Sequence, residues 1–163
     1  MLAACQDYLG FVVASERAGE TPKMRNVELA RKLDNLAWVI HALTLPEGDL
    51  QVDPAEGEPV VDDEHVYQLI SAGFPDLGWY PVVYPSDFAD PAEVLTGDAI
   101  DDLRDIYLDL NAFVWTYENV SKYWAVHGVQ AMYRVHWGKH LRDVQSYLHS
   151  AIYGSCSSRT STT

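Results

Sequence analysis

The chain has few basic residues and few cysteines, and each shortage excludes a class of protein. Eleven lysines and arginines stand against 24 aspartates and glutamates among the 163 residues, which gives a formal net charge of −13. Phosphate backbones are bound through basic patches, so nucleic acid is not an expected partner. The two cysteines, Cys5 and Cys156, lie near opposite ends of the chain and form no disulfide framework. We therefore expect a cytoplasmic protein with reduced thiols.

Long apolar runs and catalytic signature motifs are also missing. No stretch of about 18 apolar residues occurs, so no membrane-spanning segment is expected. Neither a GxSxG nucleophile motif nor a phosphate-binding glycine loop is present, and neither cysteine lies in a histidine context. Nothing in the sequence therefore supports nucleophilic catalysis.

What is present is the composition of an ordinary globular protein, with 48% hydrophobic and 21% charged residues. A chain of roughly 150 residues buries about two-thirds of the surface that its unfolded form exposes, which is enough for one stable core. We expect a single helical domain over residues 1–153 and a disordered serine- and threonine-rich tail over residues 154–163.

Helical periodicity predicts an all-α, single-domain bundle of about five helices. Cap and breaker residues mark several ends: Gly19 is placed to end the first helix, Thr21 to begin the second, and Asp62 and Asp98 to begin later ones. The predicted helices cover residues 2–18, 22–45, 62–73, 98–119 and 121–153. Residues 74–97 contain four prolines among aromatic residues, which predicts a long irregular loop before a C-terminal antiparallel helix pair.

Acidic residues are concentrated in the middle of the chain. Residues 46–110 contain seventeen acidic residues and a single base, Arg104, whereas residues 1–45 are neutral and residues 111–163 carry a net charge of +3. Such a segment is either a solvated region that maintains solubility or a surface for a basic protein or a cation. Because no catalytic set is recognisable, the first hypothesis is a non-catalytic adaptor or inhibitor whose acidic middle binds a basic protein.

The last two predicted helices each carry polar residues beside an apolar stripe. At about 100° per residue, aspartates lie at one margin of the first helix and histidines at the corresponding margin of the second. In an antiparallel pair, residues whose numbers sum to about 240 lie level, so Asp102 lies opposite Gly138 and Asp105 opposite Val135, near the two histidines. The candidate metal-ligating residues are Asp102, Asp105, Asp109, His136 and His140.

Three arrangements would satisfy these aspartates: an ion pair with His140 or Lys139, a divalent metal shared by carboxylates and imidazoles, or solvent. A histidine pair at i, i+4 is a weak metal signal, because the familiar zinc helix has glutamate where this chain has Trp137. The second hypothesis is a metal-binding protein or a metal-dependent hydrolase. In either case we expect His140 to be mostly buried and bonded to Asp102 or Asp105, and Trp137 to anchor the core.

Three segments together resemble a known family: GDAIDDLRDIYLDL (97–110), HWGKHLRDVQSYLH (136–149) and the preceding GWYPVVYP. They resemble DUF5063, a bacterial family of domains of unknown function. The resemblance implies a short, all-helical protein without an assigned activity, and it supplies no catalytic roles. It adds Tyr107, Trp137 and Gly138 as structural members of the motif, whose other positions are Asp101, Asp102, Asp105, Asp109, His136 and His140.

Overall fold

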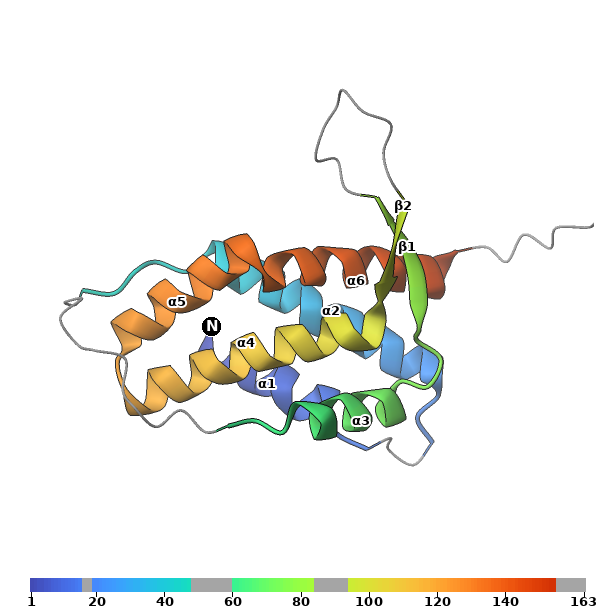
Figure 1. Ribbon diagram of the computed structural model, residues 1–163, viewed down its shortest axis with the longest axis horizontal. Coiled ribbons are helices and arrows are strands. Elements are labelled where there is room, and N and C mark those ends of the chain that lie inside the picture. The colour runs from blue at the N-terminus through green and yellow to red at the C-terminus, as the bar shows by residue number, and fades with distance from the viewer. Residues whose placement is uncertain (16–18, 48–59, 84–93, 155–163) are drawn as a thin grey trace, which may run out of the picture.

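Six helices and one two-stranded β-sheet form the described part of the chain, residues 1–15, 19–47, 60–83 and 94–154, in the computed structural model (Figure 1). The elements are α1 (Leu2–Val12), α2 (Pro22–His41), α3 (Asp63–Gly73), β1 (Trp79–Val83), β2 (Val94–Asp98), α4 (Ala99–Asn119), α5 (Lys122–Val135) and α6 (Trp137–Tyr153). The prediction of a mostly helical protein is confirmed. Within these residues, none of the helices combines the length and hydrophobicity that a bilayer crossing requires. The predicted disordered tail lies outside the described residues, except Gly154.

Four helices begin at polar residues that cap them. The side chains of Thr21, Asp62 and Asp98 accept hydrogen bonds from backbone N–H groups in the first turns of α2, α3 and α4, at 3.2, 3.0 and 3.0 Å. Ser121 does the same for α5 at 3.4 Å. Each bond satisfies a backbone donor that the helix leaves unpaired. Because the bond forms within one helical turn, the first residue of each of these helices could be predicted from the sequence.

The end of α1 differs from the prediction. The helix ends at Val12 rather than near Gly19, which lies in the connection to α2 with a φ of +83°. The backbone carbonyls of Phe11 and Ala14 accept hydrogen bonds from the Arg25 guanidinium, so a residue of α2 caps the end of α1.

Arg25 of α2 is a charged residue inside the core. Its side chain is buried, and its guanidinium carbon lies 5.0 Å from the ring centre of Phe11 and 4.6 Å from that of Phe74. Glu20 supplies the counter-charge at 3.1 Å. Cation–π contacts and an ion pair together offset the cost of burying the charge.

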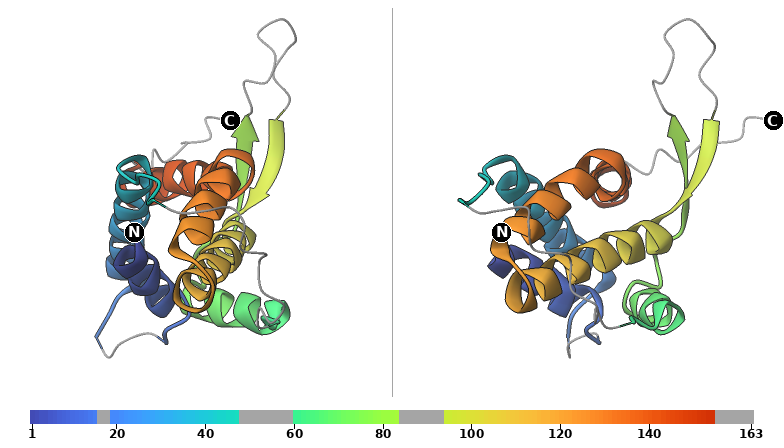
Figure 2. Two further views of the ribbon diagram at one scale, coloured as in Figure 1. Left: turned by 90° about the vertical axis from the view of Figure 1, so that its left-hand side faces the viewer. Right: turned by 60° about the vertical axis from the view of Figure 1, so that its left-hand side comes forward.

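The segment predicted as an irregular loop contains a β-hairpin. β1 and β2 pair antiparallel from Trp79 opposite Asp98 to Val83 opposite Val94, and the intervening residues 84–93 lie outside the described part. Pro81 is tolerated because a two-stranded sheet has only edge strands. Figures 1 and 2 show the hairpin rising away from the helices beside α6.

The last predicted helix is two helices that meet at His136. This residue has φ −140° and ψ −92°, outside the helical region, and it ends α5 and precedes α6. Trp137 follows it directly and is fully buried, with its indole N–H donating to the carbonyl of Val129 at 3.2 Å. The break lets α5 and α6 both pack against α4. Trp137 therefore has the core-anchoring position expected of it.

The core lies around α4, which packs against α1, α3, α5 and α6. Figure 2 shows α1 and α2 grouped beside α4 and α5 in two views. Fully buried side chains from five helices fill the interior, including Tyr8, Leu29, Leu33, Leu36, Ile70, Leu103, Ile106, Leu110, Trp137 and Leu141. One face of α4 is thus fixed by packing, which determines where its polar margin points.

Gly138 is predicted to be indispensable at the α5–α6 junction. A Cβ atom there would lie 2.0 Å from the backbone carbonyl oxygen of Tyr133, so the junction would have to shift. We expect Gly138→Ala to lower the free energy of unfolding by about 2 to 3 kcal/mol, measured by urea denaturation. Gly128, inside α5, is the matched control because a Cβ there meets open space. Gly128→Ala should stabilise the protein by about 0.5 to 1 kcal/mol. Equal effects of the two changes would contradict this account of the junction.

Candidate functional site

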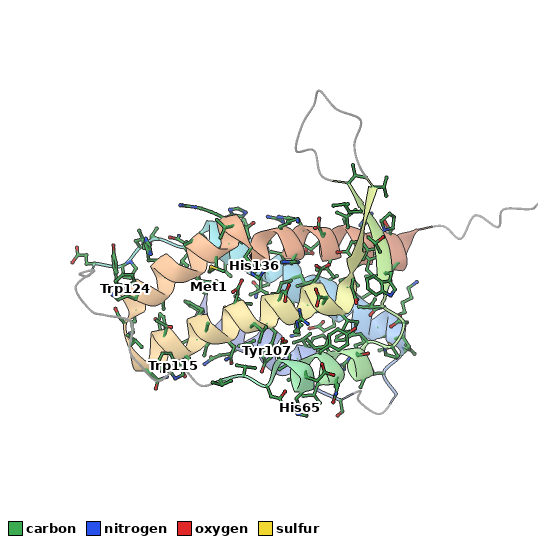
Figure 3. All side chains as sticks on the ribbon, in the orientation of Figure 1. Met1, His65, Tyr107, Trp115, Trp124 and His136 are labelled. Carbon is green, nitrogen blue, oxygen red and sulfur yellow. The ribbon has the colours of Figure 1, made fainter. Side chains whose placement is uncertain are left out.

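A cluster of carboxylates and imidazoles lies where α4 passes the beginning of α6. Asp102, Asp105 and Asp109 project from α4, while His136 occupies the α5–α6 junction and His140 follows one helical turn later. Figure 3 labels His136 at this junction, above α4. The structure brings all five predicted metal-ligating residues to this one region, through bonds between the two helices.

Asp102 and His140 form the most buried pair of the cluster. The Asp102 side chain is 9% exposed and that of His140 is 21% exposed, and His140 Nδ1 lies 2.6 Å from Asp102 Oδ1. A carboxylate has no proton to donate, so Nδ1 carries the hydrogen and donates it. The other oxygen, Oδ2, accepts a hydrogen bond from the Tyr80 hydroxyl. The predicted bond between His140 and an α4 aspartate is therefore present.

His136 and Asp109 repeat this arrangement near the α5–α6 junction. His136 Nδ1 lies 2.7 Å from Asp109 Oδ2, and the imidazole is 42% exposed. The ring centres of His136 and His140 are 4.9 Å apart, with the rings at 74°. In both histidines the Nδ1 atom is hydrogen-bonded to an aspartate. When the ring is neutral, its Nε2 atom carries a lone pair that can bind another partner.

Asp105 is held from the opposite side by Arg104. Arg104 Nη2 lies 3.0 Å from Asp105 Oδ1, while Asp105 Oδ2 lies 3.5 Å from His140 Nε2. The same guanidinium contacts Asp101 at 2.5 Å and Asp63 of α3 at 3.2 Å. Arg104 thus supplies positive charge to these aspartates, a partner that was not among the three predicted from the sequence, which were His140 or Lys139, a divalent metal, and solvent.

Three of the five predicted residues point ligand atoms toward one another. Asp105, His136 and His140 each offer one such atom, and among the described residues these atoms all lie within 4.8 Å of one another. Asp102 and Asp109 instead lie behind the histidines and bond to their Nδ1 atoms. The cluster therefore contains three converging groups, Asp105, His136 and His140. Each of them is oriented by a further residue that bonds to it.

The surroundings of the cluster change the pKa values of His140 and Asp101. The hydrogen bond to Asp102 raises the pKa of His140, burial lowers it, and the charges of Asp102 and Asp105 raise it further against the opposing effect of Lys139. Burial raises the pKa of Asp101, with the neighbouring Asp105 as the next cause. Without a metal, His140 consequently keeps its second proton to a higher pH than a free histidine does.

The remaining motif residues have structural positions. Trp137 is buried beneath the histidines, and Gly138 allows close approach of Tyr133. Tyr107 on α4 is partly buried against the core, and burial raises its pKa.

Sequence reasoning did not predict two residues that contact the cluster, Arg104 and Tyr80. Arg104 had a signal, because it is the single base between residues 46 and 110 and neighbours Asp101 and Asp105 on one helix. Tyr80 had none, since its approach to Asp102 depends on the hairpin.

The protonation of His140 predicts how stability depends on pH in protein kept metal-free with a chelator. Because the folded pKa is raised, the contribution of the His140 ion pair is fully present below the unfolded pKa of about 6.5 and is lost as pH rises through the folded pKa. The difference in unfolding free energy between wild type and His140→Gln should therefore shrink from about pH 5.5 to about pH 8.5. His149, exposed on the same helix, is the control. A difference that grows with pH would contradict the assignment.

The family of the chain follows from comparison with known proteins. The sequence profile described as "Domain of unknown function (DUF5063)" matches residues 3–154. Neither a curated protein nor a solved structure matches the chain. The matched region contains α1 except its first residue, every other helix and strand of the described structure, and the whole Asp/His cluster. The chain belongs to the DUF5063 family.

Proposed function

We propose that the protein binds a divalent transition-metal ion through His136, His140 and Asp105. One observation carries the proposal: each of these three groups has its other polar atom held by a partner. Asp102 and Asp109 accept from the two Nδ1 atoms, and Arg104 donates to one oxygen of Asp105. Metal-binding histidines in proteins are oriented in this way, by a carboxylate bonded to the ring nitrogen that does not touch the metal.

The ligand types indicate which ions the site would accept. Two imidazoles with one carboxylate suit zinc and its first-row neighbours, whereas calcium and magnesium prefer shells made of oxygen. Ligand atoms about 2.1 Å from a tetrahedral zinc lie about 3.4 Å apart. His140 Nε2 and Asp105 Oδ2 are already 3.5 Å apart. His136 is the most exposed of the three ligands, so modest rotation of its ring would complete the triangle.

The surrounding charge also favours a cation. Asp102, Asp105 and Asp109 place three carboxylates around two imidazoles, and Arg104 is the one guanidinium that contacts this group in the described structure. An ion bound by three protein groups keeps a position for water, as hydrolytic zinc sites do. Metal binding is the function that these contacts support, and hydrolysis would be a use of that open position.

Metal binding is tested on untagged protein freed of metal by a chelator. Isothermal titration with zinc should show one equivalent bound, and His136→Gln should raise the Kd at least about 100-fold, because it removes a ligand. Zinc at about 100 times its Kd should raise the unfolding free energy of wild type by about 2.7 kcal/mol. His149→Gln, an exposed histidine on α6, should behave as wild type. No zinc binding by wild type, or equal affinity in His136→Gln, would refute the site.

An adaptor or inhibitor that binds a basic protein remains a second candidate, supported by exposed acidic residues. Asp62, Asp63 and Glu64 lie exposed at the start of α3. Residues 48–59 and 84–93 of the acidic segment 46–110 lie outside the described part.

The acidic segment can be tested by charge reversal. Changing several acids between residues 47 and 64 to lysine should weaken binding to a basic partner protein, and added salt should weaken wild-type binding in the same way, because the attraction is electrostatic. Pull-down at two salt concentrations measures both effects. Binding that neither change alters would dismiss this candidate.

We propose a cytoplasmic location only from the cysteine content, because two cysteines near opposite ends of the chain form no disulfide framework. Cys5 is buried in α1, and burial raises the pKa of its thiol to about 12. Such a thiol is unreactive and belongs to the core. Cys156 lies outside the described residues.

A further inference from the structure

Tyr80 connects the β-hairpin to the Asp/His cluster. Its side chain is buried, and its hydroxyl donates a hydrogen bond to Asp102 Oδ2, while Asp102 Oδ1 accepts from His140. A single carboxylate therefore joins β1, α4 and α6. The two oxygens of Asp102 are satisfied by two segments that are far apart in the sequence.

Two neighbours, Tyr147 and Gly97, fix the position of the Tyr80 ring. One face stacks on Tyr147 of α6, with ring centres 4.8 Å apart and an angle of 15° between the planes. The Tyr147 hydroxyl in turn accepts a hydrogen bond from the backbone N–H of Gly78 at 3.2 Å, just before β1. Across the hairpin, Tyr80 pairs with Gly97, where a Cβ atom would lie 2.8 Å from the ring. Gly97 thus makes the room that this ring needs.

These contacts make the hydroxyl of Tyr80 a means of orienting Asp102. Removing it would leave one oxygen of a nearly buried carboxylate without that donor, and such a group turns toward other partners. The direction of Asp102 determines the direction of the His140 ring, because Nδ1 follows Oδ1. Any ion that favours the bonded His140–Asp102 arrangement must therefore favour the docked hairpin, since coupling between two events is reciprocal.

We propose that Tyr80 is a positioning residue for the metal site and that metal binding stabilises the docked hairpin through Asp102. This proposal rests on the metal-binding function proposed above and assigns that site a regulatory output. The output is the order of β1 and β2, which rise from the bundle (Figure 2). The exposed side chains Trp79, Val83 and Val94 lie on these strands. Metal binding would thus determine how stably the strands that carry these exposed apolar side chains are docked.

The test uses Tyr80→Phe, which removes the hydroxyl and keeps the ring that stacks on Tyr147 and fits Gly97. Zinc affinity is measured by titration calorimetry, and amide hydrogen exchange of residues 79–83 and 94–98 is followed with and without zinc. In wild type, zinc should slow hairpin exchange. In Tyr80→Phe, zinc should bind about 3- to 10-fold more weakly and should no longer slow exchange in the hairpin. Tyr123→Phe, which removes a hydroxyl near the start of α5, is the matched control and should behave as wild type.

The outcomes separate this proposal from the metal site itself. If wild type binds zinc but Tyr80→Phe binds it equally well and hairpin exchange ignores zinc, the role of Tyr80 is overturned and the metal site stands. If wild type binds no zinc, both proposals fail. Should Tyr80→Phe not fold, the wild-type exchange experiment decides alone: protection of hairpin amides by zinc supports the coupling, and its absence overturns it.

Discussion

The Asp102 carboxylate is nearly buried, and much of the surrounding structure serves to compensate it. An unpaired carboxylate in such a position costs several kcal/mol, so hydrogen-bond donors must approach both oxygens. His140 reaches it from α6 and Tyr80 from β1, so three segments meet at one side chain. The core faces of α4 and α6 bring the backbones together, and Asp102 then fixes which polar groups face each other. Asp102 thus connects the hairpin, His140 and the cluster beside them.

The pentapeptide HWGKH shows how packing and chemistry share a short segment. Trp137 enters the core, Gly138 lets the helix junction close on Tyr133, and His136 and His140 point toward the aspartates of α4. A continuous helix would also place residues 136 and 140 one turn apart. The break at His136 makes it the first residue before a new helix, where its ring can reach Asp109 while Trp137 remains buried. The pattern that resembled a weak zinc motif is therefore a junction whose histidines are held by carboxylates.

Features set by neighbouring residues could be predicted from the sequence, and features set by distant ones could not. Thr21, Asp62 and Asp98 cap helices through bonds within one turn, and helical spacing placed Asp102 and Asp105 near His140. The early end of α1 depends on Arg25, whose aromatic partners come from α1 and from the residue after α3. The hairpin pairs residues on either side of 84–93, and its prolines argued against strands. Consequently the sequence could predict that these five residues lie together, but not that Asp105, His136 and His140 converge while Asp102 and Asp109 bond behind the histidines.

We propose that this cluster holds a metal ion through the Nε2 atoms that its aspartates leave available. The most direct measurement is a crystal structure of the protein grown with zinc, with anomalous scattering recorded on both sides of the zinc absorption edge. We expect one zinc ion bonded to Nε2 of His136, Nε2 of His140 and a carboxylate oxygen of Asp105, with both Nδ1–aspartate bonds retained. The opposite result would be an anomalous map without a peak at the cluster and a structure in which His140 Nε2 bonds directly to Asp105. That result would show an ion-pair network in place of a metal site.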